Sequence, residues 1–274
     1  MADATEQTRR AVLGTIAAGA GLMSMSGETT AQAQGNANTP NAKTFVLVHG
    51  AWHGGWCWRR VSDLLEKKGH KVFTPTMTGL GERSHLIDPK VNLATHITDI
   101  VNVIKWENLN DIVLVGHSYG GAIISGVAEQ VPESIGSIVF LDAFVPETGD
   151  SLATKTSQPV REAIAAAVQR GDTTMKAVPA AVFRVNEKDR AWVDAKCTPH
   201  PMATLTDKIT LTGAREKVAK KTYIRAKGYP SVPFDGYQEK LKADSAWRCY
   251  EMPCGHDAMV DMPDRLTEIL LEVG

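Results

Sequence analysis

The sequence predicts an α/β protein in which helices cover both faces of a mostly parallel sheet. Segments typical of strands and helices alternate along most of the chain, which is the pattern of parallel strands joined by helical crossovers. The clearest unit begins with Ile112–Val115, an apolar, β-branched run that is typical of a strand buried on both faces. The turn Gly116-His117-Ser118-Tyr119-Gly120 and a helical segment, Ala122–Gln130, follow directly. We expect about six strands in one domain spanning residues 43–274.

The remaining elements follow from apolar composition and spacing. Thr95–Glu107 predicts an amphipathic helix because its isoleucines recur at helical spacing, and Gly69 is a typical helix stop. The expected strands are Thr44–His49, Lys71–Thr74, Ile112–Val115, Ile135–Leu141, Thr222–Arg225 and Trp247–Glu251. The other expected helices are Trp56–Lys68, Ala122–Gln130, Asp235–Ala243 and one starting at Pro263.

The alternation stops between Glu147 and Lys220. This stretch has no strong strand, but it contains helix-like pieces, Pro159–Gln169 and Asp189–Asp194, interrupted by prolines. A segment of this length without strands favours a helical insertion over the sheet, such as a lid, rather than a separate domain. We therefore expect a lid insertion at about residues 147–220.

The first 33 residues have the composition of a targeting segment. The pair Arg9-Arg10 precedes a weakly apolar stretch, Ala11–Met25, and Ala31-Gln32-Ala33 offers a cleavage site of small residues. These features together resemble a Tat-type export signal, followed by a polar linker at residues 34–42. The stretch is too short and too rich in glycine to span a membrane stably. We expect an exported protein, periplasmic or secreted.

Charge and cysteine spacing exclude several classes of function. The 274 residues carry 30 basic and 31 acidic side chains without a long run of one sign. This balance argues against nucleic acid or an anionic membrane as the main partner. The four cysteines and the histidines show no metal-ligand spacing, so we expect no metal. Disulfide pairing and oligomeric state are left open by the sequence.

The pentapeptide around Ser118 is the candidate catalytic motif. A G-x-S-x-G turn between a buried strand and a helix lifts the serine hydroxyl clear of the sheet, and glycine is required where backbones crowd. The start of the following helix offers free N–H groups to a developing oxyanion. These features favour Ser118 as a nucleophile.

Two motifs together resemble the plant methylesterase and hydroxynitrile lyase group of the α/β-hydrolases. The first is Val46–Trp56, which contains most of the pattern H-G-x-x-H-G-G-x-x-W that bacterial esterases share and that begins here at His49. The second is Gly116–Gly121. The resemblance implies an α/β-hydrolase fold with six parallel strands and an enzyme that needs no cofactor. It also implies His256 as the base after the final strand, and an oxyanion hole made by the main-chain N–H groups of Ala51 and Tyr119.

The triad acid departs from the pattern of the group. Its members place an aspartate just after the penultimate strand, but here no carboxylate follows Thr222–Arg225 until Asp235. Asp142 closes the strand after the nucleophile helix, where some superfamily members carry their acid. The acid needs only to reach the far imidazole nitrogen of the base. We expect Asp142 to be the acid, with Asp235 and then Asp257 as alternatives.

The expected activity is that of a serine carboxylesterase acting on small to medium apolar or aromatic carboxylic esters. Aromatic residues indicate an apolar acyl or aryl pocket under the insertion. The aromatic residues considered for the pocket are Trp52, Trp56, Trp58, Phe144, Phe183 and Trp192.

Two alternative functions remain open. One is a hydroxynitrile lyase, although such enzymes carry a lysine where Asp257 follows His256, and a carboxylate would repel cyanide. The other is a ligand-binding receptor on a hydrolase scaffold. The natural substrate and chain-length preference are left open.

Overall fold

The computed structural model describes residues 42–274. The predicted export signal, residues 1–33, and all but the last residue of the predicted linker lie outside the described residues.

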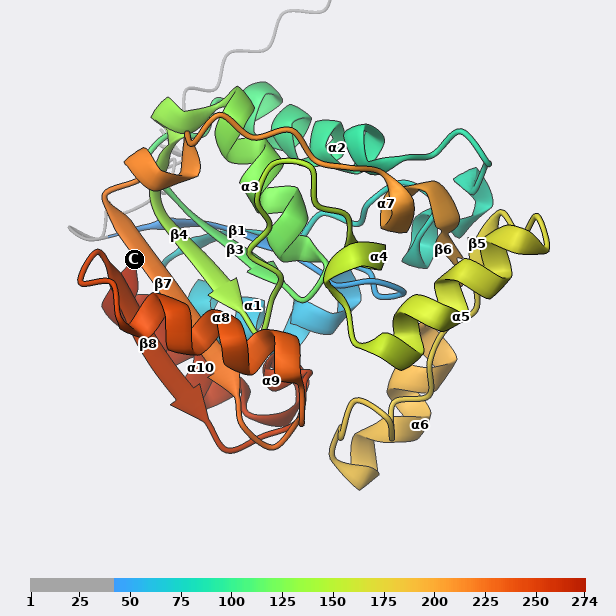
Figure 1. Cartoon of the computed structure of the whole chain (residues 1–274). Coiled ribbons are helices and arrows are strands. Elements are labelled where there is room, and N and C mark those ends of the chain that lie inside the picture. Colours follow the sequence, from blue (N-terminus) through green and yellow to red (C-terminus); the bar gives the residue numbers. More distant parts are fainter. Residues whose placement is uncertain (1–41) are drawn as a thin grey trace, which may run out of the picture. The chain divides into compact units, whose positions relative to one another are not determined.

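The described chain is built on one six-stranded sheet in the order β2-β1-β3-β4-β7-β8, with every neighbouring pair parallel. This confirms the predicted fold class and strand number (Figure 1). Parallel pairing brings the carboxyl ends of the strands to one edge of the sheet, where sites form in open α/β sheets. The strands are β1 (Thr44–Val48), β2 (Lys71–Phe73), β3 (Ile112–His117), β4 (Ile135–Leu141), β7 (Lys220–Ala226) and β8 (Trp247–Met252).

The middle of the sheet forms the core. All six residues of β3 are buried, and β4 is buried except for Gly136. Strands that are covered on both faces read as continuous apolar runs, which is why β3 and β4 were recognisable from composition. β2, at one edge, is only three residues long and has no fully buried residue.

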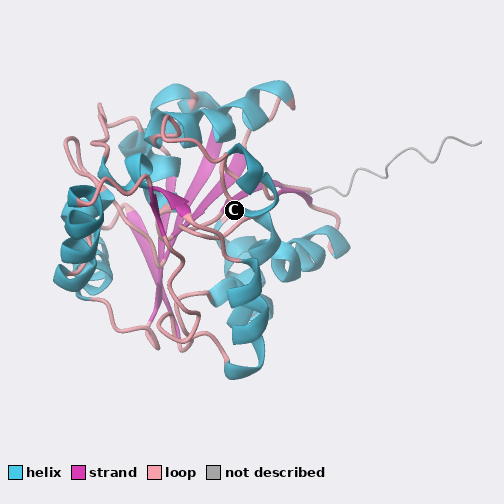
Figure 2. Ribbon diagram, turned by 90° about the vertical axis from the view of Figure 1, so that its right-hand side faces the viewer, coloured by secondary structure: helices cyan, strands magenta, loops and turns pink. Residues whose placement is uncertain are grey.

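Helices lie on both sides of the sheet (Figure 2). α2 packs against α3, and α1 packs against α10. None of the helices in the described part of the chain is both long and apolar enough to cross a membrane. The helices outside the insertion are α1 (Arg59–Lys67), α2 (Leu93–Trp106), α3 (Gly120–Gln130), α8 (Val232–Lys242), α9 (Ala258–Asp261) and α10 (Pro263–Val273); short 3-10 turns are η1 (Gly55–Trp58), η2 (Gly81–Leu86) and η3 (Pro132–Ser134).

Local sequence sets where these helices begin. The Asn92 side chain accepts a hydrogen bond from the N–H of Thr95, and the Thr95 hydroxyl accepts one from the N–H of Asn92, which forms a reciprocal cap at the start of α2. Pro263 is the first residue of α10, where its missing N–H and fixed φ cost nothing.

Most of the regular elements between residues 147 and 220 are helices, and the segment also contains a small antiparallel pair. Its elements are α4 (Leu152–Lys155), α5 (Gln158–Gln169), β5 (Thr174–Met175), α6 (Glu187–Lys196), β6 (His200–Pro201), α7 (Met202–Thr206) and η4 (Arg215–Lys217). β5 pairs with β6. The sequence did not predict these two strands, because two residues are too few to show an alternating pattern.

Candidate active site

Ser118 occupies a sharp turn between β3 and α3. Its φ is 54°, in the left-handed region, where an L-residue costs about 1–2 kcal/mol. A Cβ added at Gly116 would lie 2.6 Å from the carbonyl oxygen of Gly120, and one at Gly120 would lie 2.9 Å from that of His49. Both glycines of the motif are therefore required for space. The turn leaves Ser118 partly exposed although its neighbours are buried.

The structure brings His256 and Asp142 together. The imidazole Nδ1 of His256 donates a hydrogen bond of 2.6 Å to Oδ2 of Asp142. Asp142 follows β4 directly and is fully buried, and His256 is 3% exposed. Residues 117 and 141 are paired in the β3–β4 register, so Ser118 and Asp142 leave neighbouring strands side by side. The bond to Nδ1 directs the other ring nitrogen, Nε2, away from the carboxylate.

Arg225, at the end of β7, holds the other oxygen of Asp142. Its guanidinium donates to Oδ1 at 2.8 Å, and the N–H of Ala226 donates to the same oxygen at 3.0 Å. Arg225 also binds Asp235, the alternative acid, at 3.1 Å, and Lys227 binds Asp235 at 2.9 Å. These two cations lower the pKa of Asp235 although burial opposes the shift. Asp235 is thus tied to Arg225 and Lys227, while Asp142 contacts His256.

The imidazole of His256 is enclosed by aromatic rings. Phe234 stacks on it at a centroid distance of 5.5 Å, and Tyr229 lies 4.7 Å away. The N–H of His256 donates to the carbonyl of Phe183, in the insertion, at 2.8 Å. His117 donates from Nε2 to the carbonyl of His256 at 3.0 Å. Both the ring and the backbone of this residue are therefore fixed by neighbours.

The two predicted oxyanion donors lie beside Ser118. Ala51 follows the end of β1, which pairs with β3, and Tyr119 is the residue after the serine. Within residues 42–274 neither main-chain N–H donates to another protein group. Two unpaired N–H groups near the serine can stabilise an oxyanion.

A second buried carboxylate, Asp257, stands beside the base. Its Oδ2 accepts a 3.0 Å hydrogen bond from Nε2 of His53, whose Nδ1 donates to the carbonyl of Ala51 at 2.8 Å. Burial favours the neutral form of each group, but the charge of the partner and their hydrogen bond raise the pKa of His53 and hold that of Asp257 well below its usual range. The two form a buried ion pair. This pair was not predicted from the sequence.

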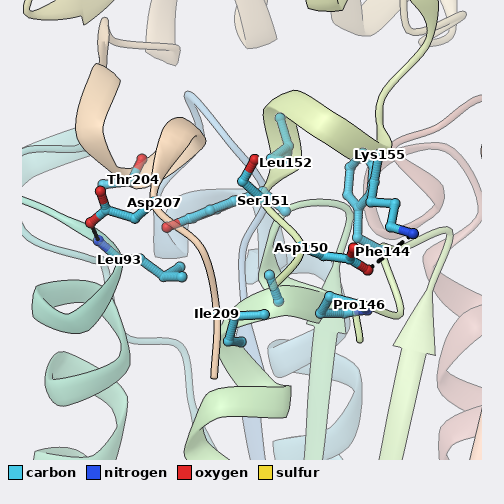
Figure 3. A pocket seen from close by; sticks show the side chains of 12 residues that line it. Leu93, Phe144, Pro146, Asp150, Ser151, Leu152, Lys155, Thr204, Asp207 and Ile209 are labelled. Carbon is cyan, nitrogen blue, oxygen red and sulfur yellow. Dashed lines mark hydrogen bonds and ion pairs between the residues drawn. The ribbon is translucent and has the colours of Figure 1, made fainter. Parts of the chain in front are cut away.

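A small, mostly apolar pocket opens next to the nucleophile turn (Figure 3). Tyr119 lines it, and the N–H of Phe144, another lining residue, donates to the carbonyl of Ser118 at 3.1 Å. α4 and α7 of the insertion close the other side through Leu152 and Thr204. The pocket is lined by Leu93, Tyr119, Ala122, Phe144, Pro146, Asp150, Ser151, Leu152, Lys155, Thr204, Asp207 and Ile209.

Of the aromatic residues considered for such a pocket, only Phe144 lines this one. Trp58 is fully buried in the core, and Trp56 stacks on His53 at 5.3 Å and meets Trp192 edge-on at 5.0 Å. These tryptophans pack the region behind the site, because their large apolar area favours complete burial.

The described residues contain no cluster of three or more histidine, cysteine, aspartate or glutamate side chains arranged to hold a metal ion. All four cysteines lie in this part of the chain and are unpaired.

Comparisons with known proteins identify the family of the chain. Residues 45–269 match the model of the alpha/beta hydrolase family. The chain is 43% identical over 239 residues to a carbendazim hydrolyzing esterase from Nocardioides sp. (strain SG-4G), covering 84% of this chain and 99% of that protein. It is 26% identical to putative methylesterase 11 of Arabidopsis thaliana over 84% of this chain, but it spans only 63% of that protein.

A solved structure with the same fold is an extracellular α/β-hydrolase from a Paenibacillus species, described as a structural and functional homologue of tobacco salicylic acid binding protein 2. It is 27% identical, with a TM-score of 0.75 over 85% of this chain and 99% of that one. The family match covers most of the chain, and the Nocardioides relative is similar along nearly its whole length. The chain therefore belongs to the alpha/beta hydrolase family.

Proposed function

We propose that this protein is a serine carboxylesterase that hydrolyses small to medium apolar or aromatic carboxylic esters through an acyl-enzyme on Ser118. The observation that carries the proposal is the buried 2.6 Å bond between His256 Nδ1 and Asp142, beside a serine at φ 54°. The esterase relatives support the reaction class.

The proposed mechanism uses three side chains and two main-chain donors. The Ser118 hydroxyl attacks the ester carbonyl while His256 Nε2 accepts its proton. Asp142 keeps the Nδ1–H tautomer and stabilises the imidazolium that forms. The N–H groups of Ala51 and Tyr119 donate to the carbonyl oxygen as it becomes an oxyanion. His256 then gives the proton to the leaving alcohol. Water next attacks the acyl-enzyme carbonyl while His256 accepts its proton, and His256 returns that proton to Ser118 as the carboxylic acid leaves.

The pocket beside Tyr119 supports an apolar substrate group. Its wall is formed mainly by aliphatic and aromatic side chains from α2, Tyr119 and α3, the segment after β4, and the insertion. One charged pair, Lys155 with Asp150 at 3.1 Å, lies at the pocket (Figure 3). The open volume of the pocket, about 10 Å³, is room for about one water molecule, so an acyl or aryl group must displace the lining side chains of the insertion.

Turnover of p-nitrophenyl acetate and butyrate tests the proposal. We expect hydrolysis by the wild type and its loss in Ser118→Ala, with one equivalent of a phosphonate bound at Ser118 in the wild type only. Carbendazim belongs in the substrate panel because it is named for the 43% identical relative. Failure of the wild type to hydrolyse any ester would contradict the proposal and favour a ligand-binding receptor.

A hydroxynitrile lyase fits the site less well. Asp257 follows the base directly, is fully buried and is held ionised by His53. This position therefore carries a carboxylate that is already paired with His53, in place of the lysine that hydroxynitrile lyases carry after the base.

A further inference from the structure

Residue 51 is the centre of a set of hydrogen bonds made by three buried histidines. Nε2 of His49 accepts the N–H of Met77 at 3.1 Å, so its Nδ1 carries the proton that is donated to the carbonyl of Gly50 at 2.8 Å. That carbonyl and the N–H of Ala51 belong to one planar peptide unit. Fixing the carbonyl therefore also fixes the direction in which Ala51 N–H points.

The next peptide unit is held at both of its polar ends. His53 donates to the carbonyl of Ala51 at 2.8 Å, and the N–H of Trp52 donates to Nδ1 of His200 at 3.2 Å. His49 and His53 belong to the loop itself. His200 is different, because it comes from β6 in the insertion, 148 positions away from Trp52 in sequence.

The insertion holds Trp52 at two further points. Its carbonyl accepts the N–H of Thr198 at 3.0 Å, and its indole N–H donates to the carbonyl of Met175, in β5, at 3.1 Å. Trp52 has φ 65°, a left-handed conformation that is unfavourable for tryptophan. Such a residue persists only where its surroundings over-determine it, and here the paired strands β5 and β6 supply that constraint (Figure 1).

His200 is itself locked in one tautomer. Because Nδ1 accepts from Trp52, Nε2 carries the proton, which it donates to the Thr204 hydroxyl at 2.7 Å; that hydroxyl donates to the carbonyl of Pro201 at 2.8 Å. The His200 ring is fully buried and meets the ring of Tyr119, the second oxyanion residue, edge-on at 5.0 Å. One side chain of the insertion thus contacts both segments that carry the oxyanion donors.

We propose that His200 is a positioning residue for the oxyanion hole, through which the insertion aligns the N–H of Ala51. The inference rests on the proposed esterase function and goes beyond it. It makes the insertion part of the machinery that stabilises the transition state, in addition to any role as a cover over the substrate.

The decisive comparison is between two substitutions at this position. His200→Leu keeps apolar bulk but removes the acceptor for Trp52 N–H. His200→Asn places an oxygen at the same distance along the side chain as Nδ1, although it leaves more empty space. Losing a whole oxyanion donor costs about 10²–10³ in kcat, and loss of one of its supports should cost about 10- to 100-fold. We expect this loss in His200→Leu with KM changed by less than threefold, and recovery to within about fivefold of wild type in His200→Asn.

A trifluoromethyl ketone gives a second readout, because its adduct with Ser118 carries an oxyanion. We expect His200→Leu to weaken inhibition by the same factor that it lowers kcat, while binding of the ester substrate is retained. The matched control is His70→Leu. Nδ1 of His70 accepts the N–H of Lys43 at 3.1 Å, which is the same type of bond. It lies where β1 and β2 begin, at the end of the sheet opposite to the carboxyl ends of the strands. This control should lose some thermal stability and keep kcat.

Two results would overturn the inference. One is wild-type kcat in His200→Leu; the other is a kcat that follows the melting temperature across the three variants, with His200→Asn no more active than His200→Leu. Both would leave the esterase proposal intact. Absence of ester turnover in the wild type would overturn the esterase proposal and this inference with it.

Discussion

Replacing Asp142 by asparagine gives the sharpest test of the proposed triad, because the structure dictates how the new side chain would orient. Oδ1 of Asp142 accepts from two donors, the guanidinium of Arg225 and the N–H of Ala226, while Oδ2 accepts from His256 alone among residues 42–274. The amide oxygen of asparagine must take the place of Oδ1, since an NH₂ group there would face two donors. The amide NH₂ is then directed at His256.

An NH₂ group opposite Nδ1 favours the wrong imidazole tautomer. Nδ1 would have to accept, so the proton would move to Nε2, which then cannot take the proton of Ser118. The same substitution in a serine protease triad lowers kcat by about four decades. At about 1.36 kcal/mol for each factor of ten, this raises the barrier by about 5.4 kcal/mol. Ester hydrolysis by purified, folded Asp142→Asn measures the loss.

Asp235→Asn is the matched control. It removes a carboxylate that binds the same arginine but is 39% exposed and bonded to Arg225 and Lys227. We expect less than a tenfold loss of kcat. Retention of more than a tenth of wild-type activity by Asp142→Asn, or a loss of four decades in Asp235→Asn, would refute the assignment of the acid.

Three further predictions concern the ion pair, the serine turn and the N-terminus. The lowered pKa of Asp257 adds stability above about pH 4 that is lost in acid, and the raised pKa of His53 adds stability below about pH 6.5 that is lost as pH rises. Asp257→Asn should therefore lower the free energy of unfolding by about 3–5 kcal/mol between about pH 4 and pH 6.5, and by less at pH 3. A difference between this variant and the wild type in urea unfolding that does not change with pH would contradict the ion pair. Ser118→Gly should be about 0.5–1 kcal/mol more stable than Ser118→Ala, because glycine tolerates φ 54° at some cost in chain entropy; equal melting temperatures would argue against strain there. We also propose that residues 1–33 are cleaved on export, so N-terminal sequencing of protein from the native host should start near Gln34, and an intact Met1 in a cytoplasmic fraction would contradict this.

The sheet could be predicted closely because its signals are local. Ile135–Leu141 was predicted with the same bounds as β4, and the terminal helix was placed correctly at Pro263. Strands buried on both faces have no polar positions to obscure their apolar pattern. The carboxyl ends of parallel strands share one edge, so candidate residues following those ends could be grouped without coordinates.

The contacts within the insertion and behind the site could not be predicted in the same way. The pairing of β5 with β6 depends on two residues in each strand, and the bond from Trp52 to His200 depends on tertiary approach alone. The ion pair of His53 with Asp257 required the three-dimensional arrangement of residues 204 positions apart. Spacing in sequence contains no information on such encounters.

The distances in sequence between the site's partners have a consequence for how activity arises. The bond from His256 to Asp142 closes 114 positions, and that from Trp52 to His200 closes 148. Contacts of this span form late, because their loop-closure entropy must be offset by structure already in place. A nascent chain that has emerged only as far as β7 can hold most of the sheet yet lacks its base. During refolding, ester hydrolysis should therefore return later than the helical circular-dichroism signal. The return of hydrolysis reports that the native state is complete.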